Sequence, residues 1–154
     1  MVPRVSTAES AEALILVAHT DADKLQDIED ALEPCGHCVF SASDGKSALR
    51  LFEALNPDLV ILDFMMSGER EHTLCSLIRA RSQVPVMMVV PKGSHDENRK
   101  AILSGLEAGA DHWIFEPFLP AELAARVWAI LRRSEHGARS HRRCSASNST
   151  QTER

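Results

Sequence analysis

Five short apolar runs alternate along the chain with segments of helical spacing, and this alternation constrains the fold more than any other feature. In the first helical segment, Leu25, Ile28 and Leu32 fall on one face of a helix. Strands that alternate with helices form βαβ crossovers, so the pattern predicts an α/β fold with a parallel sheet covered on both faces. The expected strands are 14–18, 38–41, 59–63, 85–90 and 112–115.

Glycine, asparagine and proline stand where this pattern needs the helices to begin and end. Gly36 is expected to end the first helix, Asn56-Pro57 the second and Gly105 or Gly109 the fourth, and Pro120 to open the fifth. One domain over residues 10–133 accounts for all the strands and helices. Residues 134–154 are rich in Ser, Thr, Asn and Arg and cannot form a core, so we expect a disordered basic tail or a truncated linker.

The charge is unevenly distributed, and it limits the classes of partner. The chain carries a net charge of −5, but residues 132–154 hold six arginines against two glutamates. An acidic body disfavours nucleic-acid binding except through the tail. No apolar run reaches the roughly 18 residues of a membrane span, and residues 1–10 lack the apolar core of a signal peptide. We therefore expect a cytoplasmic protein without a membrane partner.

A binding site in an open parallel sheet lies at the carboxyl ends of the strands. Asp63 ends the run Leu59–Leu62 there, and His19, Thr20 and Asp21 follow the first strand. A carboxylate at the end of an apolar strand is a phosphate acceptor, a metal ligand or a solvated strand end. Position alone leaves these three alternatives open.

Three segments carry a resemblance to a known family. Residues 56–68 read NPDLVILDFMMSG, residues 108–111 read AGAD and are followed by EPF at 116–118 and PAEL at 120–123, and residues 43–49 read SDGKSAL. In this order and spacing they resemble response-regulator receiver domains, over about residues 13–133. The resemblance implies a flavodoxin-like, doubly wound five-stranded sheet in the order 2-1-3-4-5. It also implies a cis bond before Pro117.

The resemblance further implies a phosphoryl-transfer site. In the family, the aspartate that ends the third strand, here Asp63, accepts a phosphoryl group from a histidine kinase or a small donor. Two acidic residues after the first strand help it to hold Mg²⁺. A Ser or Thr after the fourth strand and a Lys after the fifth bind the phosphoryl oxygens, and an aromatic residue on the fifth strand follows the hydroxyl.

Most of these positions differ in this chain. His19 and Thr20 stand in place of the acid pair, although Asp21 lies close, and Val90 replaces the hydroxyl residue. Glu116 replaces the lysine, which reverses the charge facing a phosphoryl group. The remaining differences are Trp113 at the aromatic switch position, Ser67 before Gly68, and Glu71 where a Gly is expected.

These differences lead to two main hypotheses for function. The first is an atypical receiver module that acts through protein–protein contacts, with Mg²⁺-dependent phosphorylation impaired or absent and no cofactor or enzymatic turnover. Its contact surface would include parts of 97–107, Trp113 and 121–133, for a homodimer, a histidine kinase or an output protein. The alternative is a working receiver phosphorylated on Asp63.

Other residue clusters suggest further alternatives. Cys35-Gly36-His37-Cys38 matches a thiol redox motif, but such a motif needs its first Cys at a helix N-terminus, and this one follows a helix. Zinc at these residues lacks a fourth clustered ligand. His19, Asp21 and Asp63 could form a mixed site for a softer metal ion. The simpler expectation is that His19 donates a hydrogen bond to Asp63.

Overall fold

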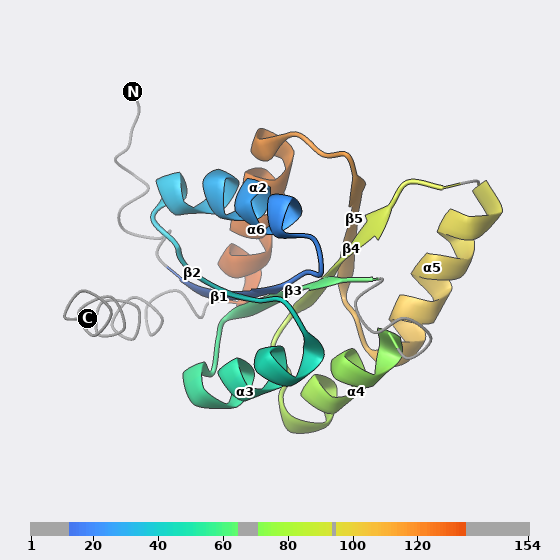
Figure 1. Cartoon of the computed structure of the whole chain (residues 1–154), viewed down its shortest axis with the longest axis horizontal. Helices are drawn as coiled ribbons and strands as arrows, with labels where there is room; N and C mark the ends of the chain where they lie inside the picture. Colours follow the sequence, from blue (N-terminus) through green and yellow to red (C-terminus); the bar gives the residue numbers. More distant parts are fainter. Residues whose placement is uncertain (1–12, 65–70, 94, 135–154) are drawn as a thin grey trace.

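The computed structural model describes residues 13–64, 71–93 and 95–134 (Figure 1). All neighbouring strands of its single five-stranded sheet pair in parallel, in the order β2-β1-β3-β4-β5. The fold and strand order predicted from the sequence are therefore confirmed. The strands are β1 (Leu14–Ala18), β2 (Cys38–Ala42), β3 (Leu59–Asp63), β4 (Val86–Pro91) and β5 (His112–Glu116).

Helices cover both faces of the sheet and divide the core in two (Figure 1). One core packs under α2 and α6 and contains Ile15, Ile61 and Val127. The other packs under α3, α4 and α5, and contains Val60 and Val90. The elements are α2 (Ala22–Leu32), the 3-10 helix η1 (Glu33–Cys35), α3 (Gly45–Leu55), α4 (Glu71–Arg81), α5 (His95–Ala108) and α6 (Pro120–Ser134).

The ends of the helices follow the local sequence signals. Asp44 caps the N-terminus of α3, where its side chain accepts a hydrogen bond from the Ser47 N–H. Asn56 ends α3 in the left-handed conformation, and Gly36 ends η1 in the same way. Of the two glycines expected to end the fourth helix, Gly109 does so, with φ of 104°. Gly105 lies inside α5.

Arg79 joins the end of α4 to the turn before β5. Its guanidinium donates to the carbonyls of Ser82, Val84 and Gly109 and to the Asp111 carboxylate, at 2.7–3.1 Å. Asp111 also accepts from the Val86 N–H at 3.0 Å, so the network fixes the start of β4. A Cβ on Gly109 would lie 3.0 Å from Arg79 Cγ, so the close approach of this side chain favours glycine there.

Some sequence expectations fall outside the described residues. These are residues 10–12 of the expected domain, the basic tail at 135–154 and the motif residues Ser67 and Gly68. Within the described ranges, no helix combines the length and apolarity needed to cross a membrane. The Glu116–Pro117 bond is cis, as the family resemblance implied.

His37 makes the stability of the fold depend on pH. It is buried between η1 and β2, and among the described residues its Nδ1 has no hydrogen-bond partner. Burial lowers the pKa of this imidazole from 6.5 to about 4. Protonation therefore favours the unfolded chain, so the stabilisation is complete above pH 6.5 and is lost as the pH falls towards 4.

We expect this residue to contribute a loss of about 2 kcal/mol in unfolding free energy between pH 7.5 and 5, from linkage at these pKa values. Urea unfolding of the wild type and of His37→Leu at both pH values measures this loss in unfolding free energy. The difference isolates His37 from other groups, such as His112, whose pKa is also lowered by burial. If the unfolding free energies of the two proteins fall equally between the two pH values, His37 is not the source of the loss.

Candidate functional site

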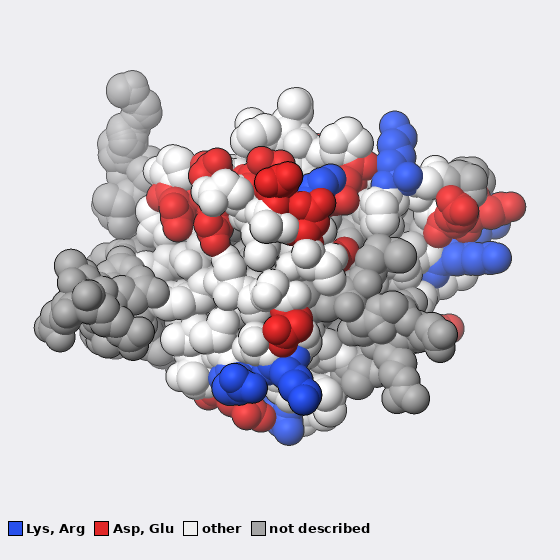
Figure 2. Space-filling model, in the orientation of Figure 1, with Lys and Arg blue, Asp and Glu red and all other residues white. Residues whose placement is uncertain are grey.

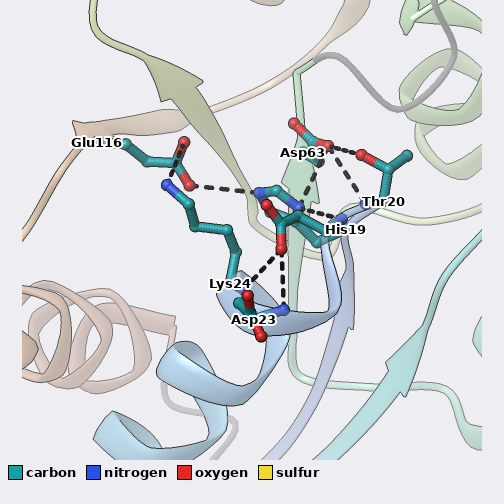
Figure 3. A network of polar contacts seen from close by, with 7 residues as sticks. His19, Thr20, Asp23, Lys24, Asp63 and Glu116 are labelled. Atoms are coloured by element: carbon teal, nitrogen blue, oxygen red, sulfur yellow. Dashed lines mark hydrogen bonds and ion pairs between the residues drawn. The ribbon is translucent and has the colours of Figure 1, made fainter.

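The carboxyl ends of the strands bring His19, Asp63 and Glu116 together at one edge of the sheet (Figure 3). Ala18 pairs with Leu62, so the residues that follow β1 lie beside the end of β3. Glu116 ends β5 and pairs with Pro91 at the end of β4. His19, Asp63 and Glu116 are all buried, at 5%, 6% and 9% exposure. The sequence analysis predicted all three residues at this edge, and in the structure His19 contacts both carboxylates.

His19 lies between the two carboxylates, and each of its ring nitrogens has its own partners. Its Nδ1 accepts a hydrogen bond from the Asp21 N–H at 3.0 Å, so the ring proton of the neutral imidazole is on Nε2. That nitrogen lies 3.3 Å from Glu116 Oε2 and donates to it. Nδ1 also lies 3.4 Å from Asp63 Oδ2, a contact that becomes an ion pair only when His19 is protonated. His19 thus contacts Asp63 as the sequence analysis expected, but in this tautomer its ring N–H donates to Glu116.

Thr20 supplies the hydrogen bonds to Asp63. Its hydroxyl donates to Asp63 Oδ2 at 2.9 Å, and its backbone N–H lies 3.3 Å from the same oxygen. A buried carboxylate is costly unless it is hydrogen-bonded. At the end of β3, a hydroxyl and a backbone amide provide that compensation.

Lys24 completes the network, and the sequence analysis did not identify it. Its ammonium lies 3.4 Å from Glu116 Oε1, so the reversed charge of Glu116 finds a cation on α2 (Figure 3). The signal was a lysine in the first turn of the helix after β1, which only the packing of α2 against the sheet makes relevant. The two residues also line a surface cavity of about 350 Å³ with Asp27, Asp30, Pro117, Phe118 and Pro120.

Asp21 has a structural role. Its carboxylate caps α2 by accepting from the Asp23 and Lys24 N–H groups, at 2.9 and 3.4 Å. The side chain is exposed, and it is the backbone N–H of Asp21 that contacts His19. The alternative in which Asp21 joins His19 and Asp63 at a metal site finds no support in this arrangement.

Val90 and Trp113 lie on the other face of the sheet from the helix that carries Lys24. Val90 is buried in the core beneath α3 and α4, and Trp113 packs against the same core from β5 while partly exposed. Val90 offers only an apolar side chain at its position.

Metal and thiol chemistry find little support in the geometry. Over the ranges that the structure describes, no group of three or more His, Cys, Asp and Glu side chains is placed to hold a metal ion. Cys35 is a free thiol and ends η1 rather than beginning a helix, and its Sγ lies 3.7 Å from the Ala31 carbonyl. Cys38 is disulfide-bonded, so the two cysteines of the motif are not joined to each other. Cys75 is buried in α4, and burial raises its pKa. Cys144 lies outside the described residues.

Comparison with known proteins decides the family. Residues 15–128 match the response regulator receiver domain. The chain belongs to this family. It thus contains a response regulator receiver domain, and its strand order is the one expected for such a domain.

Individual relatives agree with this assignment. The receiver is 39% identical to the probable transcriptional regulator ycf27 of Guillardia theta, over 80% of this chain and 47% of that protein. It is also 39% identical to the DNA-binding response regulator MtrA of Mycobacterium leprae, over 79% of this chain and 52% of MtrA. The chain thus spans about half the length of these curated relatives.

One solved structure is matched over nearly the whole of its own length. A putative response regulator from Chloroflexus aurantiacus has a TM-score of 0.70 and 29% identity, over 79% of this chain and 98% of that one.

Proposed function

We propose that this receiver acts through protein–protein contacts and that its pocket is stable without Mg²⁺ or a phosphoryl group. One observation carries the proposal: the His19 imidazole bridges the space between Asp63 and Glu116. With Thr20 donating to Asp63 and Lys24 paired with Glu116, each buried carboxylate has a partner from the chain itself. The pocket therefore needs no cation to offset its negative charge.

The residues present do not fit Mg²⁺. This ion needs near-octahedral oxygen ligands and loses its waters reluctantly. The two positions after β1 offer an imidazole and a hydroxyl, and that hydroxyl donates to Asp63. The further carboxylate after β1, Asp21, caps α2. Glu116 is paired with His19 and Lys24. Asp63 is the carboxylate left for the ion, so we expect Mg²⁺ binding to be weak or absent.

A phosphoryl group on Asp63 would also lack stabilisation. Phosphoryl transfer depends mainly on positioning and on neutralising charge. Glu116 would repel the phosphoryl oxygens, and Val90 has no donor for them. Each missing interaction of this kind costs a few kcal/mol of transition-state stabilisation, by analogy with the loss of one preorganised donor. We therefore expect no efficient phosphorylation.

Incubation with acetyl phosphate and MgCl₂, followed by intact mass spectrometry, tests this part of the proposal. We expect the wild type to gain no phosphoryl adduct, like the control variant Asp63→Asn. An adduct on the wild type that is absent from Asp63→Asn would instead support the alternative, a working phosphoacceptor receiver.

We propose the surface of α5, β5 and α6 as the contact face for protein partners, such as a second copy, a histidine kinase or an output protein. Leu103 and Leu106 on α5 are 54% and 48% exposed and supply its apolar part. The face over α2 differs in character, because acidic side chains gather there, which disfavours nucleic acid (Figure 2).

Sedimentation at several protein concentrations tests whether a second copy binds this face. Self-association that Leu106→Glu weakens and Asp63→Asn leaves unchanged is the expected result. A monomer at every concentration would contradict the dimer. Association that Asp63→Asn weakens would contradict binding that is independent of the pocket.

A further inference from the structure

A small basic pocket lies on the α6 side of the sheet, away from Asp63. Arg126 and Arg133 are seven residues apart on α6 and therefore share one face of the helix. His112 pairs with Met87 in the sheet register, so both point towards this face. The cavity is about 110 Å³ in volume and is lined by Met87, His112, Arg126, Ala129, Ile130 and Arg133.

Within the residues that the structure describes, the positive charge of this pocket has little compensation. None of its lining residues is acidic. Asp111, next to His112, is bound to Arg79 at 2.7 Å. Arg126 pairs with Glu122 at 3.5 Å, and both side chains are about half exposed, where an ion pair is worth little. Two guanidinium groups and an imidazole thus surround the cavity.

Burial and nearby charges shift the pKa of the His112 imidazole. The pKa of His112 is lowered, first by burial and then by the charges of Arg133 and Arg126 on α6, while Asp111, which precedes β5, acts in the opposite direction. An anion in the cavity would offset the two arginines, so it would raise the pKa of His112. The imidazole therefore reports on occupancy.

We propose that this pocket binds a phosphate-class dianion, at a site separate from Asp63. A dianion balances the two arginines, and guanidinium groups bind phosphate through paired hydrogen bonds. The cavity suits one tetrahedral group, because sites for larger ligands begin at about 300 Å³. Ala129, Ile130 and Met87 give it an apolar wall that strengthens the charge interactions. The group is either free phosphate or a phosphoryl monoester on a larger molecule.

NMR of the His112 ring in the full chain tests the proposal, with inorganic phosphate, N-acetyl-phosphoserine amide and glutarate as probes. We expect saturable shifts with phosphate and a rise in the His112 pKa. Binding of the phosphoserine probe as well would identify presented monoesters as ligands, whereas binding of phosphate alone would identify the free ion. Glutarate, a dianion without a tetrahedral head, should bind more weakly.

Arginine variants locate the site. Arg126→Gln and Arg133→Gln should each weaken phosphate about 10-fold or more, because each removes hydrogen bonds to a charged group. Arg132→Gln is the matched control: this guanidinium lies 4.5 Å from the centre of the Trp128 ring, outside the pocket lining, and its loss should leave affinity unchanged. Unchanged amide spectra would show that the variants are folded. Non-saturating shifts, equal affinity for glutarate, or an equal loss in Arg132→Gln would overturn the proposal.

Discussion

A variant that restores the family's residues to the pocket is expected to bind Mg²⁺ and beryllofluoride, in contrast to the weak or absent binding that we expect of the wild type. It combines His19→Asp, Thr20→Asp, Val90→Thr and Glu116→Lys. The first two substitutions place carboxylates beside Asp63, and oxygen ligands are those that Mg²⁺ prefers. The last two supply a hydroxyl and a cation for the phosphate mimic. We expect a Mg²⁺ dissociation constant in the millimolar range, about −4 kcal/mol of binding free energy.

Fluorescence of Trp113 in a Trp128→Phe background measures this binding. Glu116→Lys alone is the control, and it should remain silent because it adds no carboxylate. An unchanged amide spectrum before titration would confirm that the combined variant folds. A folded variant that binds neither ion would mean that these four positions are not what separates this pocket from an active one.

Removing the Arg79 side chain is expected to lower the unfolding free energy by about 3 kcal/mol, because several charge-assisted hydrogen bonds, most of them part-buried, are lost together. Its guanidinium binds three carbonyls and Asp111 at the junction of α4, β4 and β5. The midpoint of thermal unfolding should fall by roughly 10 °C for a domain of this size. Arg79→Lys should recover only part of the loss, because an ammonium cannot reproduce the planar fork.

Arg81→Ala on the same helix is the matched control. Its ion pair with Glu53, at 3.3 Å, joins two half-exposed side chains, so the expected loss is below about 0.5 kcal/mol. Urea unfolding of Arg79→Ala and Arg81→Ala beside the wild type measures the difference. Equal stability of the two variants would contradict the role given to Arg79.

The sequence predicted the fold well because the signals that specify it are local. Apolar runs such as 59–63 and the helical periodicity on α2 and α6 depend on neighbours in the chain, and so do the terminators Asn56 and Gly109. Arg79 was not identified, because its partners Gly109 and Asp111 lie thirty residues away and meet it only in the folded chain.

The candidate site was predicted in position but not in its bonding. Strand ends identify His19, Asp63 and Glu116 as neighbours, because parallel strands end at one edge. Which atom His19 bonds to depends on the orientation of its ring, which the Asp21 N–H sets. The cation for Glu116 comes from Lys24 on a neighbouring helix, and Asp21 caps that helix instead of facing the pocket. The contact between Lys24 and Glu116 depends on helix packing, which residue spacing does not encode, whereas the capping role of Asp21 is a local signal that the sequence analysis did not use.

NMR amide shifts of the wild-type chain, with Mg²⁺ added first and beryllofluoride second, test most directly whether the pocket works without phosphorylation. Because His19, Thr20 and Lys24 already compensate Asp63 and Glu116, we predict no saturable shifts at His19, Asp63, Val90 or Trp113. Saturable shifts that begin at Asp63 and spread to Val90 and Trp113 would contradict this account and establish a working phosphoacceptor receiver.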